Sequence, residues 1–224
     1  MRKVIFAALA VLLLAVALFF SLAPGITERS MNKVTGARLS ASPEAQALHR
    51  RLTVIDLHGD TLLWKRDLLD RASHGHVDLP RLEEGHVALQ IFSSVTKTPK
   101  GQNYDSNAGD SDNITALVIA QGQPLRTWSS LLERSLWHAE KLHRAEAASD
   151  GRLRIVRSPA DLRALLVERA GGRAVTGALL SVEGAQNLEG RAANLDRLYE
   201  AGFRMIGLVH FFDNEVGGSM HGVA

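Results

Sequence analysis

Side chains that can bind a metal ion follow two short apolar segments of the chain. His58 and Asp60 come directly after residues 52–57, and Glu183 comes directly after residues 177–182. In an extended strand, side chains two positions apart point to the same side, so His58 and Asp60 can grip one or two cations together. Because the chain has no cysteine, any metal must be bound by His, Asp or Glu. The sequence therefore predicts a metal site with His58, Asp60 and Glu183 as ligands.

Each of these groups also has a plainer interpretation. A His-x-Asp pair is typical of a solvated surface or a cap, and Glu183 could cap a helix or form an ion pair. Two features favour the metal. Asp56 extends the first group to Asp-x-His-x-Asp, and charges directly after an apolar strand are costly unless they are paired or metal-bound. The two oxygens of Glu183 could each bind one ion, which would make this carboxylate a bridging ligand.

A third polar group follows another apolar segment. His210 comes after residues 205–209 and is followed by the polar loop 211–215, where a substrate could be held. A structural role for a lone histidine is the alternative. Residues 98–112 are rich in Asn, Asp and Gly, and we expect them to form a loop over the same face. We expect His74 and His76 to be solvated loop residues.

The composition is that of a globular chain and excludes several classes of protein. The 224 residues are 46% hydrophobic and 22% charged, which is enough apolar material for a sizeable core. The 26 Lys and Arg residues exceed the 24 Asp and Glu residues by only two, and no basic patch is interleaved with aromatic residues. A nucleic-acid partner is therefore not expected. The lack of cysteine excludes disulfides, thiolate zinc sites and cysteine nucleophiles.

The N-terminus carries the signature of a membrane segment. Arg2 and Lys3 precede an uncharged and mostly apolar run, residues 4–23, and about 20 such residues can cross a bilayer. Pro24 lies directly after the best candidate for signal cleavage, which favours an uncleaved anchor over a cleaved signal peptide. Positive charge before the run implies that the rest of the chain is exported.

The sequence thus predicts a protein anchored in the cytoplasmic membrane with its domain on the outer, periplasmic side. Secretion after cleavage of the segment is the alternative. The predicted parts are a membrane anchor or signal segment at residues 1–24, a linker at residues 25–42 and a folded domain at residues 43–224.

Short apolar strands alternate with helices along the domain. The expected strands are residues 52–57, 87–94, 177–182 and 205–209. The expected helices begin after Ser42, span residues 128–148, run from Ser158 to the Gly171-Gly172 pair, and cover residues 194–199 before Gly202. This alternation indicates parallel βα units.

Polar side chains at the carboxyl ends of these strands predict a (β/α)8 barrel, in which active sites gather on that face. About the first half of such a barrel fits within this length. A doubly wound open sheet is the alternative fold, but no glycine-rich phosphate loop follows the first strand to support it.

Several motifs, taken together and in order, resemble bacterial members of the membrane (renal) dipeptidase family, the zinc metallopeptidases of type M19. The resemblance runs from about Leu52 to the end of the chain. The segments that carry it are IDLHGDTL at residues 55–62, DLPRL at 78–82, SVEG at 181–184, LVH at 208–210 and DNEVGGS at 213–219, followed by His221-Gly222.

The resemblance implies a barrel hydrolase that binds two zinc ions and cleaves dipeptides, often with a D-residue at the C-terminal position. It implies that His58 and Asp60 are first-strand ligands and that Glu183 bridges the ions. It also implies that His210 contacts the substrate and helps to polarise the scissile carbonyl. A hydroxide shared by the ions would attack the peptide bond, so that no protein nucleophile is needed.

The family pattern also implies groups that this chain lacks. Two further zinc-binding histidines and an acidic proton shuttle would lie beyond Ala224, so no catalytic residue is assigned within the chain. We therefore expect the chain alone to be inactive, unstable and exposed at its strand edges. Two alternatives remain at this stage: a metal-dependent hydrolase of other amide or lactam bonds, and a non-catalytic exported binding module. The sequence leaves open whether the protein is a homodimer.

Overall fold

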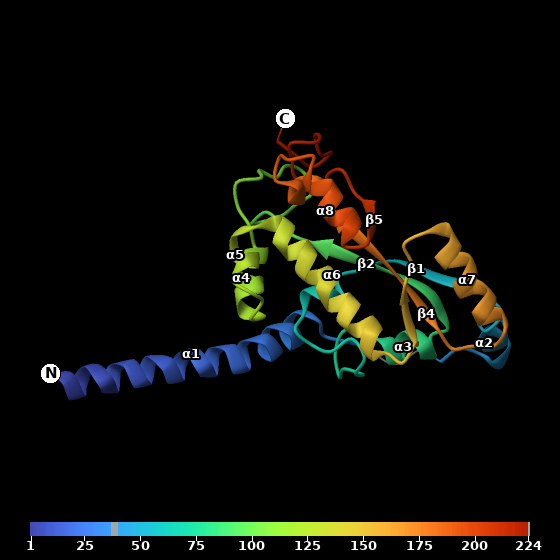
Figure 1. Ribbon diagram of the computed structural model, residues 1–224, viewed down its shortest axis with the longest axis horizontal. Coiled ribbons are helices and arrows are strands. Elements are labelled where there is room, and N and C mark those ends of the chain that lie inside the picture. Colours follow the sequence, from blue (N-terminus) through green and yellow to red (C-terminus); the bar gives the residue numbers. More distant parts are fainter. Residues whose placement is uncertain (37–39, 224) are drawn as a thin grey trace.

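The computed structural model describes residues 1–36 and 40–223 and consists of a long N-terminal helix attached to an α/β domain (Figure 1). The strands are β1 (Val54–Gly59), β2 (Val87–Val95), β3 (Leu153–Ile155), β4 (Thr176–Glu183) and β5 (Phe203–Ile206). The helices are α1 (Arg2–Met31), α2 (Pro43–His49), α3 (Leu79–Glu84), α4 (Ile114–Ala120), α5 (Arg126–Ser129), α6 (Leu131–Ala148), α7 (Pro159–Ala170) and α8 (Asn194–Glu200), and two 3-10 turns are η1 (Thr61–Leu63) and η2 (Ala185–Leu188).

All strand pairs in the described sheet are parallel. Strand β2 lies between β1 and β4, and the other side of β4 pairs first with β3 and then with β5. The four longer strands β1, β2, β4 and β5 therefore follow one another around the sheet in chain order. A doubly wound sheet would reverse its order at one point. The observed order is that of one arc of a (β/α)8 barrel, which confirms the expected fold class.

Local capping explains why the helices begin where the sequence places them. The Ser42 side chain accepts a hydrogen bond from the Ala45 amide at 3.2 Å, and the Ser158 side chain accepts one from the Asp161 amide at 3.1 Å. Proline occupies the first turn in both helices, where its missing N–H costs nothing. Helix α7 ends at Ala170, directly before the predicted glycine pair.

Two expected boundaries lie three residues from the observed ones, and one strand was missed. Helix α6 begins at Leu131 rather than near residue 128, because Ser130 has extended backbone and caps the new helix through the Glu133 amide. The last strand ends at Ile206 rather than at residue 209, since the Leu208 carbonyl accepts hydrogen bonds from Ala185 and Asn214 instead of continuing the ladder. Strand β3 was not predicted.

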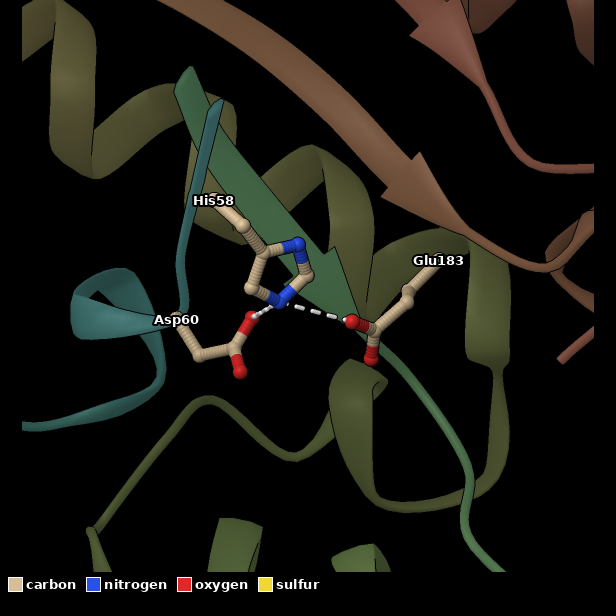
Figure 2. A group of neighbouring side chains, drawn as sticks. All are labelled: His58, Asp60 and Glu183. Carbon is tan, nitrogen blue, oxygen red and sulfur yellow. Dashed lines mark ion pairs between the residues drawn. The ribbon is translucent and has the colours of Figure 1, made fainter. Parts of the chain in front are cut away.

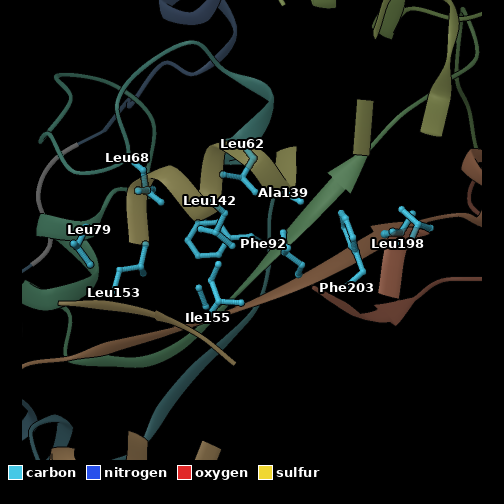
Figure 3. Close-up of a cluster of buried hydrophobic side chains, with 14 of the residues drawn as sticks. Leu62, Leu68, Leu79, Phe92, Ala139, Leu142, Leu153, Ile155, Leu198 and Phe203 are labelled. Atoms are coloured by element: carbon cyan, nitrogen blue, oxygen red, sulfur yellow. The ribbon is translucent and has the colours of Figure 1, made fainter. Parts of the chain in front are cut away.

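The core lies mainly between α6 and the sheet. Phe92 of β2 and Leu142 of α6 are fully buried there and are joined by residues from β3, β4 and β5 (Figure 3). Successive residues of β4 belong to different clusters of buried apolar side chains. Leu180 packs in this core, and Leu179 packs with Leu165 of α7. Burial on both faces explains why the strands read as nearly continuous apolar runs.

The two outer strands of the described sheet carry exposed apolar side chains. Ile55 and Leu57 of β1 and Met205 of β5 are all exposed. These positions agree with the expectation that the strand edges would be uncovered. In a closed barrel such edges pair with further strands.

Helix α1 is long and apolar enough to cross a membrane. Its mean hydropathy over the best window is 2.9, and none of that window is buried. The helix continues through Pro24 to Met31, so the first part of the segment assigned to the linker is helical. The end of the helix contacts the domain, and Glu28 there is only 3% exposed.

Substitution of Gly177 should disturb the contact between α7 and the sheet. A Cβ at this position would lie 2.5 Å from Leu165 Cδ2 and 2.8 Å from Leu89 Cδ1. Gly177→Ala is expected to lower the free energy of unfolding by about 1–3 kcal/mol because a packed core must shift. Denaturant unfolding checks this, with Gly217→Ala, where the nearest atom would be 3.6 Å away, as the control. Equal midpoints for the two variants would contradict the packing account.

Acid should destabilise the fold through His138. This side chain is 1% exposed, and its Nδ1 lies 2.8 Å from Ser94 Oγ. Burial lowers the pKa of His138 to about 3. As the pH falls below about 6.5 the unfolded chain gains a proton that the folded chain does not accept, so stability is lost in the window between these values. Between pH 7.5 and pH 5, His138→Gln should therefore lose about 2 kcal/mol less unfolding free energy than the wild type. Parallel pH profiles would show that His138 does not contribute.

Candidate metal centre

Three side chains from two distant parts of the sequence converge at the carboxyl end of the sheet. His58 lies near the end of β1, Asp60 follows that strand, and Glu183 is the last residue of β4. Their ligand atoms all lie within 4.8 Å of one another. Figure 2 shows the imidazole of His58 pointing between the two carboxylates. The structure thus brings together the residues that the sequence predicts as metal ligands.

The distances within the group are short enough for direct interaction. His58 Nε2 lies 2.8 Å from Glu183 Oε1 and 3.3 Å from Asp60 Oδ1. The His58 side chain remains 51% exposed, so the group opens to solvent on one side. A ligand could therefore reach it.

The end of β1 fixes His58 and Asp60. The strand ends at Gly59, where a Cβ would lie 3.1 Å from the amide nitrogen of the Gln90 side chain. Asp60 then starts the turn η1, and its carbonyl accepts a hydrogen bond from Leu63 N at 3.1 Å. Asp56 is not part of the group, because its carboxylate accepts a hydrogen bond from the His58 backbone at 3.0 Å.

Glu183 is fixed by a sharp turn that the sequence only partly indicates. Gly184 has a φ of 83°, which is a left-handed conformation that favours glycine. A Cβ there would also overlap the Gln186 side chain. Gln186 in turn donates a hydrogen bond to the Glu183 carbonyl at 3.0 Å. The supporting role of Gln186 was missed, since a glutamine in a turn carries no distinctive pattern.

His210 lies beside the same carboxylate but outside the group. Its Nε2 is 3.6 Å from Glu183 Oε2, and its side chain is 19% exposed. The ring stands edge-on to Phe211 with centroids 4.8 Å apart. Asn107 and Tyr104 from the loop at residues 98–112 contact His221 in the same region. This loop therefore lies against the segment that follows His210.

Burial disfavours negative charge on both carboxylates. Burial, reinforced by the nearby Asp60 carboxylate and opposed by His58, raises the pKa of Glu183 to about 7. Burial also raises the pKa of Asp60, with His58 acting in the opposite direction. The pKa of His210 is lowered by burial and by the neighbouring His58. A bound cation would compensate the charge that desolvation penalises here.

The residues fit a metal ion of the zinc type. One imidazole nitrogen and two carboxylates form a donor set that zinc accepts. Asp60 Oδ1 is buried and, apart from its ion-pair contact of 3.3 Å with His58 Nε2, takes no regular hydrogen bond within the described residues, and such a weakly paired buried oxygen calls for an explanation such as an ion. The group presents fewer donors than the four of a closed zinc site.

Comparison with solved structures supports the barrel fold. The dipeptidase AC, a metallopeptidase of family M19, has 23% sequence identity and a TM-score of 0.50, over 70% of this chain and 43% of the other. A metallopeptidase from Rhodobacter sphaeroides, solved with a phosphinate mimic of the dipeptide L-Ala-D-Ala, has 25% identity and a TM-score of 0.50, over 70% and 45% of the two chains. The probable dipeptidase PvdM from Pseudomonas aeruginosa has 17% identity and a TM-score of 0.51, over 75% and 37%.

The chain spans less than half the length of these solved structures. Among curated proteins, none matches it. The profile of the family described as membrane dipeptidase, peptidase family M19, matches residues 42–223, which is most of the chain and nearly all of the domain. The chain therefore belongs to the membrane dipeptidase family.

Proposed function

We propose that this chain supplies the first strands of a zinc-dependent dipeptidase. The observation that carries the proposal is the convergence of His58, Asp60 and Glu183 within 4.8 Å at the carboxyl edge of the sheet. Family membership supports a metallo-dipeptidase, and the relative from Rhodobacter sphaeroides was solved with a dipeptide mimic. The substrate would be a dipeptide, with tolerance of a D-residue at its C-terminal position.

Two zinc ions would bind, with Glu183 between them. The geometry of Glu183 favours a bridging role because its oxygens face different partners, Oε1 towards His58 at 2.8 Å and Oε2 towards His210 at 3.6 Å. His58 and Asp60 would serve the first ion. The remaining ligands would come from outside the described residues, since the donors of this group are too few for two ions. When bound, such ions supply an activated water and a Lewis acid for the carbonyl.

His210 would bind the substrate as a neutral imidazole. Burial and the neighbouring His58 lower its pKa, which favours the uncharged ring. In the tautomer that carries its hydrogen on Nε2, which lies 3.6 Å from Glu183 Oε2, the ring would donate a hydrogen bond to the scissile carbonyl oxygen of a bound dipeptide. Donors of this kind are typically worth on the order of 3 kcal/mol of barrier. The loop at residues 98–112 would close one side of the substrate pocket.

The protein would be held at the membrane by α1, with the domain on the outer side. Arg2 and Lys3 lie at the start of the apolar helix, and positive residues favour the cytoplasmic side. Removal of the segment by signal cleavage would instead release a secreted enzyme. The size of the protein after membrane extraction distinguishes these two forms.

Metal content and activity should both depend on Asp60. The full-length protein should bind about two zinc ions and hydrolyse dipeptides. Asp60→Asn should weaken zinc binding and lower kcat/KM by more than about 100-fold, because it removes a charged ligand while keeping the side-chain size. Zinc content by mass spectrometry and a panel of L-L and L-D dipeptides check this.

Asp56→Asn is the matched control, since Asp56 lies two positions before His58 but only accepts its backbone N–H. It should keep both zinc and activity. Hydrolysis of lactam or other amide bonds without dipeptide turnover would show that such amides, and not dipeptides, are the substrates. Absence of zinc and of turnover in the wild type would reject the proposed enzymatic function and favour a non-catalytic binding module.

Substitution of His210 should affect the reaction without affecting zinc binding. His210→Phe should retain zinc but lower kcat by about 100- to 1,000-fold, because a hydrogen-bond donor to the carbonyl is lost. Steady-state kinetics and zinc content measured on the same preparation check this. Loss of zinc in step with activity would instead make His210 a ligand, and unchanged kcat would remove it from the reaction.

A further inference from the structure

The C-terminal end of α1 packs against the domain along one helical face. Pro24, Glu28 and Asn32 are spaced by four residues, so they lie on the same side of the helix. The Pro24 carbonyl accepts a hydrogen bond from Gln121 Nε2 at 3.1 Å, and the Asn32 carbonyl accepts one from Gly75 N at 2.9 Å. The anchor helix is therefore bound to the domain at both ends of this short segment.

Glu28 is the central contact of that face. Its Oε1 lies 3.0 Å from Arg66 Nε and 3.4 Å from His74 Nε2. The Arg66 side chain is nearly buried, and His74 is not the solvated loop residue that the sequence predicts. The error has a physical cause, because the burial of His74 comes from α1, a helix distant in sequence. Removal of one partner from such a buried ion pair leaves an uncompensated charge.

Arg66 connects this contact to the metal centre. Its Nη2 donates a hydrogen bond to Thr61 Oγ1 at 2.6 Å, and its Nη1 donates one to the His74 carbonyl at 3.2 Å. Thr61 is the first residue of η1 and directly follows Asp60. The guanidinium thus bridges the anchor helix and the turn that carries a predicted zinc ligand.

A second buried basic side chain binds the same turn. Lys141 of α6 donates hydrogen bonds to the carbonyls of Leu62, at 2.8 Å, and Trp64. Burial lowers the pKa of Arg66 and brings that of Lys141 down to about 7, and the Glu28 carboxylate opposes this by favouring the charged form of both. One carboxylate from α1 therefore forms an ion pair with Arg66 and also favours the charged form of Lys141.

We propose that the end of α1 is a positioning element of the metal centre, in which Glu28 holds Arg66 against Thr61 and so fixes the turn that begins at Asp60. The metal part of this inference rests on the proposed function. In this view the anchor does more than tether the domain. It sets the geometry of one zinc ligand, through a relay of side chains that do not themselves contact metal or substrate.

The test uses Glu28→Gln, Arg66→Gln and the double variant in the full chain, purified in detergent. In metal-free protein, hydrogen exchange at the Leu63 and Trp64 amides should be at least about 10-fold faster in each single variant. Zinc affinity should fall by about 10- to 100-fold, as for groups that orient a ligand. The double variant should be no worse than the worse single variant, because both changes break one interaction.

Glu83→Gln is the matched control, since Glu83 forms a distant ion pair with Arg152 at 3.2 Å. It should leave both readouts unchanged. If Glu28→Gln unfolds the whole domain, Arg66→Lys decides, because it keeps the charge but cannot bridge Thr61 and Glu28 through a planar fork. Fast exchange confined to η1 in Arg66→Lys would support the inference.

Unchanged exchange and unchanged zinc affinity in the Glu28 and Arg66 variants would overturn the inference. A wild type that binds no zinc would reject the proposed function separately. In that case exchange at η1 alone decides whether α1 positions the turn.

Discussion

The structure depends on one electrostatic constraint, which is the close approach of two carboxylates around an imidazole at the end of a parallel sheet. Asp60 and Glu183 are partly withdrawn from water, which raises the pKa of both carboxyl groups, and the nearby Asp60 carboxylate raises the pKa of Glu183 further. His58 compensates only in part, through its contacts of 3.3 and 2.8 Å. Such an arrangement is costly without a cation. The neighbouring elements are arranged to keep it in place.

Those elements act from several directions. Strand pairing sets the register of β2 against β4, with Val95 opposite Glu183, and a glycine turn lets the chain leave directly after the carboxylate. On the other side, Asp60 begins the turn η1, which accepts hydrogen bonds from Arg66 and Lys141. Glu28 of α1 forms an ion pair with Arg66. The N-terminal helix, the sheet and the side chains of the candidate metal centre thus form one connected set of contacts.

Much of this could be predicted from the sequence because it depends on local patterns. Apolar strands ending in His58-x-Asp60 and in Glu183 predict both the barrel and its ligands, and capping serines predict the helix starts. Other features depend on contacts that no local pattern records. Gln186 supports Glu183 through a turn, His74 is buried by a helix far away in sequence, and β3 is too short to show periodicity.

The central claim is that His58, Asp60 and Glu183 bind zinc together. Its most direct test is anomalous diffraction at the zinc edge from crystals of the purified protein. The account predicts a peak about 2.0–2.2 Å from His58 Nε2 and from carboxylate oxygens of Asp60 and Glu183. A zinc-loaded crystal without density between these side chains, or with zinc bound only elsewhere, would contradict it.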